Sequence, residues 1–328
     1  MFQRRTIDKM SKIYDVLIIG GGPAGLSIAG ALARQLYTAL IIDSGVYRNE
    51  RTKHMHNVPG FDDADPADYR AKAREDLKRR YETVEFVSAH IQKVQKTAGL
   101  FEAADSQGKV YQGRKLALAT GVRDVVEEQV EGYSDCWARS IFHCLFCHGY
   151  EERGAESVGV LATGPLSSPE MLSHVSLMAK RLSKHVNIYT DGNAELIAAV
   201  KPHIHSSNIA YDDRKIVKFE HCGNSDKKPP SLMVHFEDGT SRKEGFMASN
   251  PRVEQHGPFA EQLGLEMTPT GEIKTSIPFN ETSLAGCFAA GDAATIMTTV
   301  VQAVQMGMFA GSALVAQLQR ELDEKDEL

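Results

Sequence analysis

The chain has 328 residues, of which 42% are hydrophobic and 24% charged, a composition typical of a globular protein with two domains. Its formal net charge of −6 argues against a broad nucleic-acid-binding surface, which needs clustered lysine and arginine. We find neither an apolar run of the roughly 18 residues that a membrane span requires nor a secretory signal, so we expect a cytoplasmic protein that binds no membrane.

The first elements in chain order predict one βαβ unit. They are an all-apolar strand over 16–19, a glycine turn over 20–25, a helix over 26–36 whose apolar face includes Leu36, and a second apolar strand over 39–42. A charged surface helix is expected over 66–80, followed by strands over 84–88, 100–104 and 115–119.

A second βαβ unit is predicted further along, with a strand and glycine-bearing turn over 157–164, a helix over 169–182 and a strand over 186–190. Residues 246–251 have the composition of a loop, and residues 286–319 that of a strand, a turn and a long helix. Two such units predict an α/β fold with two nucleotide-binding, Rossmann-like domains.

The first glycine turn has the spacing of a dinucleotide-binding fingerprint, G-x-G-x-x-G, between a strand and a helix. Gly20 permits the tight turn, Gly22 lets the backbone approach a pyrophosphate, and Gly25 allows close helix–strand packing. The helix N-terminus then offers free N–H groups to the phosphates. Asp43 ends the second strand, where its carboxylate can bind ribose hydroxyls. We therefore predict a bound dinucleotide rather than a turn that merely packs.

Two further segments resemble motifs of flavoproteins with two dinucleotide-binding domains. Residues 282–292 are similar to the second FAD motif, in which the aspartate at the position of Asp292 binds the ribityl chain. The helix that enters near 301–303 would point its N-terminus at the flavin. Residues 118–121 match a short turn at which the chain leaves the FAD domain. The resemblance implies that the first fingerprint binds FAD rather than NAD.

Cys144 and Cys147 form a Cys-x-x-Cys motif flanked by His143 and His148. This spacing can close a small disulfide, and the histidines favour proton transfer to and from thiols near neutral pH. The alternatives are a metal site, for which the sequence offers no second pair of ligands, and cysteines that only pack. We predict a redox pair and no metal. The isolated cysteines are expected to be packed or weakly exposed thiols, namely Cys136, Cys222 and Cys287.

The order of these motifs resembles the low-molecular-weight thioredoxin reductase family over essentially the whole chain. In that family the redox pair is followed by an aspartate that acts as the acid, and His148 stands in its place here. Three segments are more similar to one branch, the fungal gliotoxin sulfhydryl oxidases, and these are residues 43–49, 54–58 and 144–154.

This resemblance implies that Cys147 lies next to the flavin, that Cys144 exchanges with substrate, and that one of the flanking histidines is the acid/base, His148 or else His143. It also implies a homodimer whose FAD domain covers 1–122 and 249–328 around a central domain over 123–248. The residues predicted to contact FAD are Gly20, Gly22, Pro23, Ala24, Gly25, Asp43, Ser44, Arg48, His56, Asn57, Ala119, Thr120, Gly121, Gly291, Asp292, Gln302 and Ala303.

The central domain departs from the pattern that NADPH binding requires. Leu161 stands where a second glycine should let the pyrophosphate approach. The segment after the next strand, 189–195, contains no arginine for a 2′-phosphate and carries Asp191, which would repel one. We therefore interpret this domain as a vestigial nucleotide fold and expect NADPH not to bind.

Without NADPH, electrons would enter from a substrate dithiol and leave through FAD to dioxygen, giving hydrogen peroxide. The resemblance implies a small-molecule substrate, an epidithiodiketopiperazine precursor of fungal secondary metabolism. The alternatives are an NADPH-dependent thioredoxin reductase and a flavin-binding redox sensor without turnover. Residues 325–328 spell an endoplasmic-reticulum retrieval signal, which we interpret as the end of an acidic helix.

Overall fold

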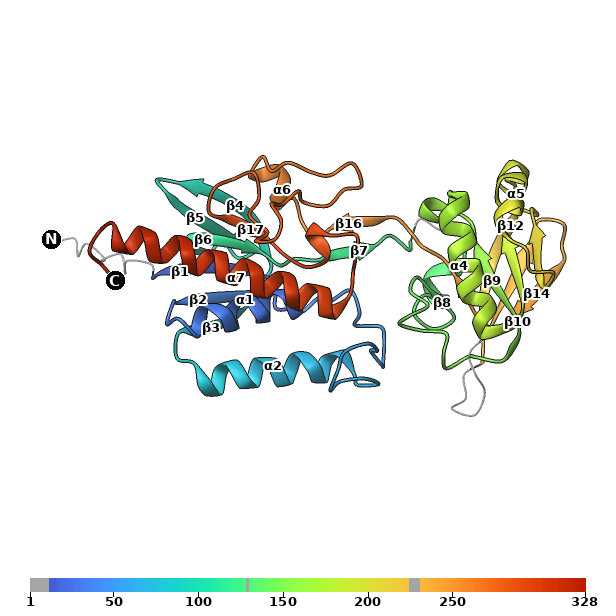
Figure 1. The fold of residues 1–328 in the computed structure, drawn as a ribbon, viewed down its shortest axis with the longest axis horizontal. Coiled ribbons are helices and arrows are strands. Elements are labelled where there is room, and N and C mark those ends of the chain that lie inside the picture. The colour runs from blue at the N-terminus through green and yellow to red at the C-terminus, as the bar shows by residue number, and fades with distance from the viewer. Residues whose placement is uncertain (1–11, 128–129, 224–230) are drawn as a thin grey trace, which may run out of the picture. The chain divides into compact units, whose positions relative to one another are not determined.

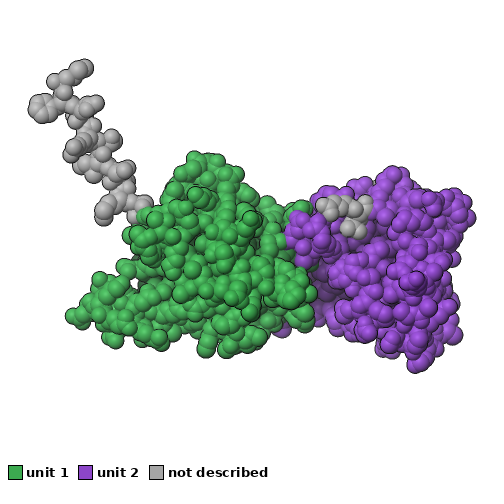
Figure 2. All heavy atoms as spheres, turned by 90° about the horizontal axis from the view of Figure 1, so that it is seen from above, with its two compact units in different colours: residues 1–50, 66–123, 255–328 green, residues 51–65, 124–254 purple. Residues whose placement is uncertain are grey.

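The computed structural model describes residues 12–127, 130–223 and 231–328. It divides the chain into two compact units, which Figure 2 colours separately. Unit 1 comprises residues 1–50, 66–123 and 255–328, and unit 2 comprises residues 51–65 and 124–254. The boundaries predicted from the sequence differ chiefly in one segment, because residues 51–65 belong to unit 2 rather than to the FAD-type domain.

Unit 1 is built on a seven-stranded sheet with the order β3-β2-β1-β6-β5-β4, in which β17 also pairs with β6. The parallel strands are β1 (Ile13–Ile19), β2 (Ala39–Asp43), β3 (Val84–Ser88), β6 (Val110–Leu118) and β17 (Cys287–Ala289). An antiparallel extension consists of β4 (Ile91–Thr97) and β5 (Leu100–Asp105). The central strands are buried on both faces, which explains their all-apolar sequences.

Helices α1 (Pro23–Ala33) and α7 (Val300–Asp323) lie alongside each other next to this sheet, and α2 (Pro66–Arg80) follows α1 in the chain (Figure 1). The close approach of α1 and α7 requires glycine, because a Cβ on Gly307 would lie 2.5 Å from the carbonyl oxygen of Ala24. One detail of the predicted helix is wrong. Leu36 lies beyond the end of α1 with φ 62° and is 80% exposed, so it contributes nothing to the apolar face.

Helix α7 is long and apolar enough to cross a membrane by length and composition alone. The sequence prediction overlooked this, although no charged residue occurs between Val300 and Gln319. One face of α7 is nevertheless part of the core of unit 1, where Ala310, Leu314 and Leu318 are fully buried. The core helix of a globular domain passes the same test, so this finding does not favour a membrane span.

Unit 2 contains a five-stranded parallel sheet with the order β11-β10-β9-β15-β8. Its strands are β8 (Ile141–Phe142), β9 (Ala155–Leu161), β10 (Ser183–Tyr189), β11 (Ile209–Asp212) and β15 (Met247–Ala248). The prediction of a loop over 246–251 is wrong for Met247 and Ala248, since Met247 pairs with both Gly159 and Ile141 inside this sheet. A two-residue strand is too short to produce a periodic pattern in the sequence.

The other elements of unit 2 surround this sheet. The helices are α3 (Tyr133–Cys136), α4 (Pro169–Leu182) and α5 (Ala194–Val200), with 3-10 turns η1 (Gly164–Ser167) and η2 (Lys201–His203). A separate antiparallel sheet, which the sequence did not indicate, consists of β12 (Ile216–Cys222), β13 (Ser231–Phe236) and β14 (Ser241–Glu244). Four short elements complete the described chain, the paired strands β7 (Val122–Asp124) and β16 (Val253–Gln255), helix α6 (Phe259–Gln262) and the 3-10 turn η3 (Asp292–Ala294).

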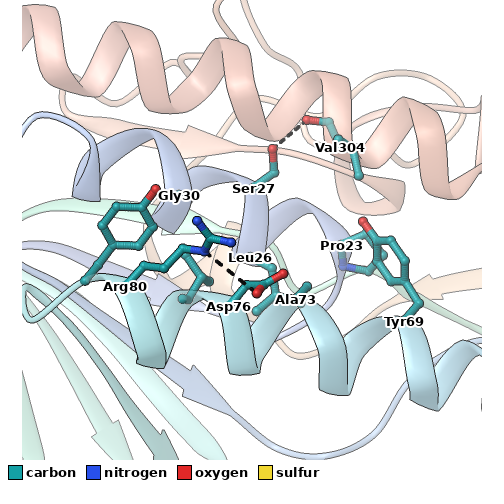
Figure 3. Close-up of a pocket in the computed structure, with 11 residues that line it drawn as sticks. Pro23, Leu26, Ser27, Gly30, Tyr69, Ala73, Asp76, Arg80 and Val304 are labelled. Carbon is teal, nitrogen blue, oxygen red and sulfur yellow. Dashed lines mark hydrogen bonds and ion pairs between the residues drawn. The ribbon is translucent and has the colours of Figure 1, made fainter. Parts of the chain in front are cut away.

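A groove of about 380 Å³ lies between α1, α2 and α7 in unit 1 (Figure 3). Its walls include Leu26 of α1, Ala73 of α2 and Val304 of α7, so much of its lining is apolar. The charged residues Asp76 and Arg80 pair with each other at 3.8 Å on one side. The Cys-x-x-Cys motif is in the other unit, and we assign this groove no chemistry.

Candidate functional site

The Cys-x-x-Cys motif follows strand β8 in unit 2, and its cysteines are joined in a disulfide with their Cα atoms 5.2 Å apart. Two backbone hydrogen bonds close this turn, because the N–H groups of Cys147 and His148 both donate to the carbonyl oxygen of Cys144, at 3.2 and 3.0 Å. Between the cysteines, Phe146 is 71% exposed. The redox turn, residues 143–149, is therefore compact in its backbone and presents an aromatic side chain at the surface.

His148 is held over an aromatic ring at the end of this turn. Its imidazole stacks on Phe142, with ring centroids 4.7 Å apart and planes inclined by 5°. The Nε2 atom lies 3.2 Å from Oγ1 of Thr52, and Nδ1 is buried without a hydrogen-bond partner among the described residues. Burial lowers the pKa of this imidazole, Glu151 raises it, and His56 and His54 lower it further. A neutral imidazole with one unused nitrogen can accept a proton.

His143, the other histidine predicted to act in proton transfer, stacks on Trp137 with ring centroids 5.7 Å apart. His143, which directly precedes the first cysteine, is therefore also stacked on an aromatic ring, as His148 is after the second cysteine. The structure brings both histidines to the redox turn, and the unused Nδ1 atom distinguishes His148. The choice between them as acid/base stays a prediction.

The segment 51–65 packs against the redox turn inside unit 2. The side chain of Asn57 donates to the carbonyl oxygen of Phe146 at 2.7 Å, and Nε2 of His56 lies 3.5 Å from the Glu151 carboxylate. His56 and Asn57 were predicted to contact FAD. In the structure they contact Glu151 and Phe146 of unit 2. Their role toward the cofactor stays a prediction. Sequence reasoning missed Thr52 and Glu151, because Thr52 is 96 residues away from the histidine that it contacts.

The glycine turn of unit 1 has the shape that a dinucleotide requires. A Cβ on Gly20 would overlap the carbonyl oxygen of Ala119, and a Cβ on Gly25 would overlap that of Gly20. Both glycines therefore permit close packing, which also brings the turn at 119–121 beside the fingerprint. A Cβ on Gly22 would meet no described heavy atom within 4 Å, so this position faces open space.

Helix α1 begins directly at this open position. Gly22 is its N-cap and Pro23 its first residue, and among the described side chains none caps it or places a carboxylate in its first turn. The first N–H groups and the positive end of the helix dipole are thus available to an anion. These features fit the pyrophosphate of FAD. The residues of the fingerprint would hold it, and Pro23 and Ala24 would lie in the helical turn beneath it.

Asp43 is buried at the end of β2 and already has partners within unit 1. Its carboxylate accepts hydrogen bonds from the Tyr47 hydroxyl at 2.5 Å, from the backbone N–H of Gly45 at 3.1 Å and from Arg74. Burial opposes ionisation, but these donors together hold the pKa of Asp43 below its usual value. Asp43 is therefore an anion. Its carboxylate can accept hydrogen bonds from ribose hydroxyls when one of its present donors is displaced. Ser44, the next residue, is exposed.

The second FAD-type segment meets the first inside unit 1. Nη1 of Arg48 lies 3.0 Å from the Asp292 carboxylate, and a Cβ on Gly291 would lie 3.1 Å from Cβ of Ala24. Thr299 caps α7 by accepting a hydrogen bond from the N–H of Gln302 at 3.1 Å. Ala303 is buried in the core that α7 shares with α1. Residues that are 244 positions apart in the chain, Arg48 and Asp292, are thus in contact, and the two motifs lie together. The FAD contacts of these residues stay predictions.

In unit 2 the corresponding position is the N-terminus of α4, and a side chain of the protein already occupies it. Ser168 caps α4, since its Oγ accepts a hydrogen bond from the N–H of Met171 at 3.2 Å. The same Oγ donates to the carboxylate of Glu170 at 3.1 Å, which places a negative charge in the first turn of α4. At the end of β10, Asp191 pairs with Lys215 at 2.8 Å and accepts a hydrogen bond from the N–H of Ile216.

The remaining cysteines are separate from this chemistry. Burial raises the pKa of Cys136 to about 11 and that of Cys287 to about 12, so both thiols are protonated at neutral pH. Cys222 is partly exposed. Within residues 12–127, 130–223 and 231–328, we find no group of three His, Cys, Asp or Glu side chains that could hold a metal ion.

Residues 14–157 match the sequence model of the pyridine nucleotide-disulphide oxidoreductase family. The thioredoxin reductase aclD of Aspergillus oryzae is 45% identical over 316 residues, which cover 95% of this chain and 98% of the relative. The chain belongs to the thioredoxin reductase family. Within this family, the thioredoxin reductase tcpT of Claviceps purpurea is 42% identical and covers 95% of this chain and 97% of its own.

A solved structure of the thioredoxin reductase-like fold agrees with this assignment. An oxidoreductase from Agrobacterium tumefaciens superposes with a TM-score of 0.81 at 30% identity, covering 94% of this chain and 99% of its own. The predicted α/β fold and the predicted family are confirmed. The protein is therefore an oxidoreductase of the thioredoxin reductase type, from a family that depends on flavin.

Proposed function

We propose that this family member is an FAD-dependent dithiol oxidase, which closes a disulfide in a small molecule and passes the electrons to dioxygen. The observation that carries the proposal is the contrast between its two nucleotide-type turns. Gly22 and the N-terminus of α1 are open to an anion, whereas Ser168 and Glu170 occupy the N-terminus of α4.

This contrast disfavours NADPH for electrostatic reasons. A pyrophosphate at α4 would compete with the Ser168 hydroxyl for the same N–H group and would be repelled by Glu170. The segment that follows β10, residues 189–195, contains no arginine for a 2′-phosphate and carries Asp191, which pairs with Lys215. Without a nicotinamide donor, the electrons have to come from the dithiol itself.

The redox turn can take these electrons in two exchange steps. A substrate thiolate attacks Sγ of Cys144, the Cys144–Cys147 bond breaks, and Cys147 leaves as a thiolate. The second substrate thiol then attacks the mixed disulfide, which forms the substrate disulfide and releases Cys144. His148, or else His143, accepts the thiol protons. FAD, when bound, supplies the remaining chemistry by accepting two electrons from the cysteine pair and delivering them to dioxygen, which gives hydrogen peroxide.

The proposed substrate class rests on the resemblance to the gliotoxin sulfhydryl oxidases, which implies a dithiol precursor of an epidithiodiketopiperazine. The exposed ring of Phe146 beside the disulfide supports a small apolar substrate. By the same resemblance we propose a homodimer, and we further propose that it acts in the cytoplasm. The second candidate is an NADPH-dependent thioredoxin reductase, which the names of aclD and tcpT favour.

Oxygen uptake distinguishes the two candidates. The purified flavoprotein is placed in an oxygen electrode with a simple dithiol, once with NADPH and once without. The oxidase requires uptake with the dithiol alone, with one peroxide formed for each dithiol oxidised. Rapid bleaching of the flavin by NADPH, without uptake on dithiol, would instead establish the reductase.

A further inference from the structure

Thr52 lies in the segment 51–65, far from the redox turn in sequence, and places its hydroxyl oxygen 3.2 Å from Nε2 of His148. The chain is anchored on both sides of this contact. Arg51 donates to the carbonyl oxygen of Ser134 at 3.2 Å, and Asn57 donates to that of Phe146 at 2.7 Å. All these contacts lie inside unit 2, so they belong to one compact body.

The imidazole of His148 is therefore fixed in two directions. Phe142 fixes its plane by stacking, and Thr52 fixes its rotation within that plane. The remaining nitrogen, Nδ1, is buried and has no partner in the part of the chain that the structure describes. A buried polar atom without a partner is costly, and a catalytic role is one of the reasons for which proteins retain one.

We propose that Thr52 is a positioning residue, whose hydroxyl accepts a hydrogen bond from Nε2–H of His148 and so leaves Nδ1 as the nitrogen that takes up the thiol proton. This inference rests on the proposed function, in which His148 is the acid/base. A hydroxyl suits the task because it accepts from Nε2–H both before and after Nδ1 is protonated. A carboxylate at this place would also raise the basicity of the ring, whereas Thr52 orients it without adding a charge.

The charged groups that act on His148 are known, so the effect of Thr52 can be separated from theirs. Glu151 favours the imidazolium, and His56 and His54 disfavour it when they are protonated. His56 in turn lies near the carboxylates of Asp62 and Glu151. Replacing Thr52 by valine changes no charge in this set, and it removes the acceptor at Nε2 while keeping the size of the side chain.

The test is a ¹⁵N NMR titration of histidine in the flavin-loaded, oxidised protein, in which the disulfide does not titrate. The His148 signals are assigned by their loss in His148→Ala. We expect the Nε2–H tautomer in the native protein. In Thr52→Val the pKa of His148 should be lower. The hydrogen bond from Nε2–H stabilises the charged imidazolium more than the neutral ring, so its removal disfavours the protonated form. Thr52→Ser should restore both the tautomer and the titration.

Stopped-flow reduction of the flavin by a dithiol provides the second readout. Because the neutral imidazole is the base, the rate should rise with pH through the pKa of His148. In Thr52→Val this rise should move to lower pH, and the maximal rate should fall roughly 10-fold, a part of the 10²–10⁴-fold that general-base catalysis contributes. In a protein that already carries His148→Ala, Thr52→Val should not lower the rate of flavin reduction any further.

Thr83→Val is the matched control, because the Thr83 hydroxyl is also buried but has no partner among the described residues. It should leave the titration of His148 unchanged. An unaltered His148 tautomer and pH profile in Thr52→Val, or an equal loss of rate in the His148→Ala background, would overturn the inference. If no dithiol is oxidised by dioxygen, the proposed function fails, while the NMR titration still decides the role of Thr52.

Discussion

At the scale of single residues, the redox turn combines one disulfide with two histidines, which in the proposed mechanism transfer protons rather than electrons. In the proposed mechanism Cys144 and Cys147 carry the electrons, and His148, which follows Cys147 in the chain and stacks on Phe142, offers a nitrogen that has no hydrogen-bond partner among the described residues. Two of the other three thiols are buried, and burial raises the pKa of both Cys136 and Cys287. Burial therefore suppresses the reactivity of these two thiols, whereas Cys222 is partly exposed.

Replacement of Cys144 by serine tests its assignment as the cysteine that exchanges with substrate. We expect Cys144→Ser to lower dithiol oxidation at least about 10³-fold, because the electrophilic sulfur is lost. The flavin should stay bound, as most of the residues predicted to contact FAD are in unit 1 and Cys144 is not among them, so the visible absorbance of the purified variant should be unchanged. Cys222→Ser, which alters a partly exposed thiol, serves as the control and should keep full activity. Loss of flavin in Cys144→Ser would contradict the assignment.

Glu244 provides a prediction about pH and stability, because it is fully buried among Ser157, Asn187 and Tyr189. Burial raises the pKa of this carboxyl, although the surrounding donors and Arg242 oppose the shift. As pH rises above about 4.3, the unfolded chain loses this proton first, so the folded state loses stability up to the raised pKa of Glu244. Glu244→Gln should remove that loss, and Tm at neutral pH should rise by a few degrees.

Thermal melting at several pH values checks this prediction. The difference in Tm between Glu244→Gln and the native protein should be small near pH 4 and should grow toward neutral pH. A difference in Tm that does not depend on pH would show that the Glu244 carboxyl has the same pKa in the folded and unfolded states.

At the scale of secondary-structure elements, the contact between α1 and α7 determines where the fingerprint sits. Gly307 and Gly311 let α7 approach α1, and a Cβ on Gly311 would lie 2.6 Å from Cβ of Ala31. The N-terminus of α1 is the proposed pyrophosphate site, so packing on the far side of this helix bears on cofactor binding.

Gly307→Ala should therefore lower both stability and retention of the flavin. Its new methyl group would lie 2.5 Å from the carbonyl oxygen of Ala24 and 2.8 Å from Cβ of Ser27, so α1 or α7 must shift. Overpacking of this kind costs about 1–3 kcal/mol, which lowers Tm by several degrees. Gly30→Ala on α1 is the matched control, since its nearest neighbour would be Leu77 at 3.8 Å. Calorimetry and the flavin content of both variants measure the effect, and equal behaviour would argue against this role of Gly307.

The elements that could be predicted from the sequence are those whose pattern is local. The glycine turn at 20–25 and the cysteine pair are contiguous motifs, and β1 and β2 are apolar because both of their faces are buried. Two features were not predictable for physical reasons. Strand β15 has two residues and no periodicity, and the partner of His148 is selected by the tertiary fold rather than by neighbouring sequence.

At the scale of the whole molecule, the two units contain different reporters. The protein has one tryptophan, and Trp137 is buried in unit 2, where it stacks on Tyr133. The proposed flavin contacts are concentrated in unit 1. Unfolding of each unit can therefore be followed separately, by tryptophan fluorescence for unit 2 and by release of flavin for unit 1.

Excess FAD should stabilise unit 1 more than unit 2. A ligand at 100 times its Kd adds about 2.7 kcal/mol to the domain that binds it. We expect the thermal midpoint of flavin release to rise by several degrees when FAD is added, and the midpoint seen by Trp137 fluorescence to change less. Equal shifts in both signals would show that the two units unfold as one cooperative body.

The assignment of residues 51–65 to unit 2 has a consequence for recombination between related enzymes, both in evolution and in protein engineering. The chain passes from one unit to the other four times, at 50/51, 65/66, 123/124 and 254/255. A recombination that exchanges only residues 124–254 with a relative would transfer His148 but leave Thr52 and Asn57 behind. A chimera of these enzymes should therefore exchange residues 51–65 together with residues 124–254. Natural variation at position 52 should likewise be compared with variation in the redox turn.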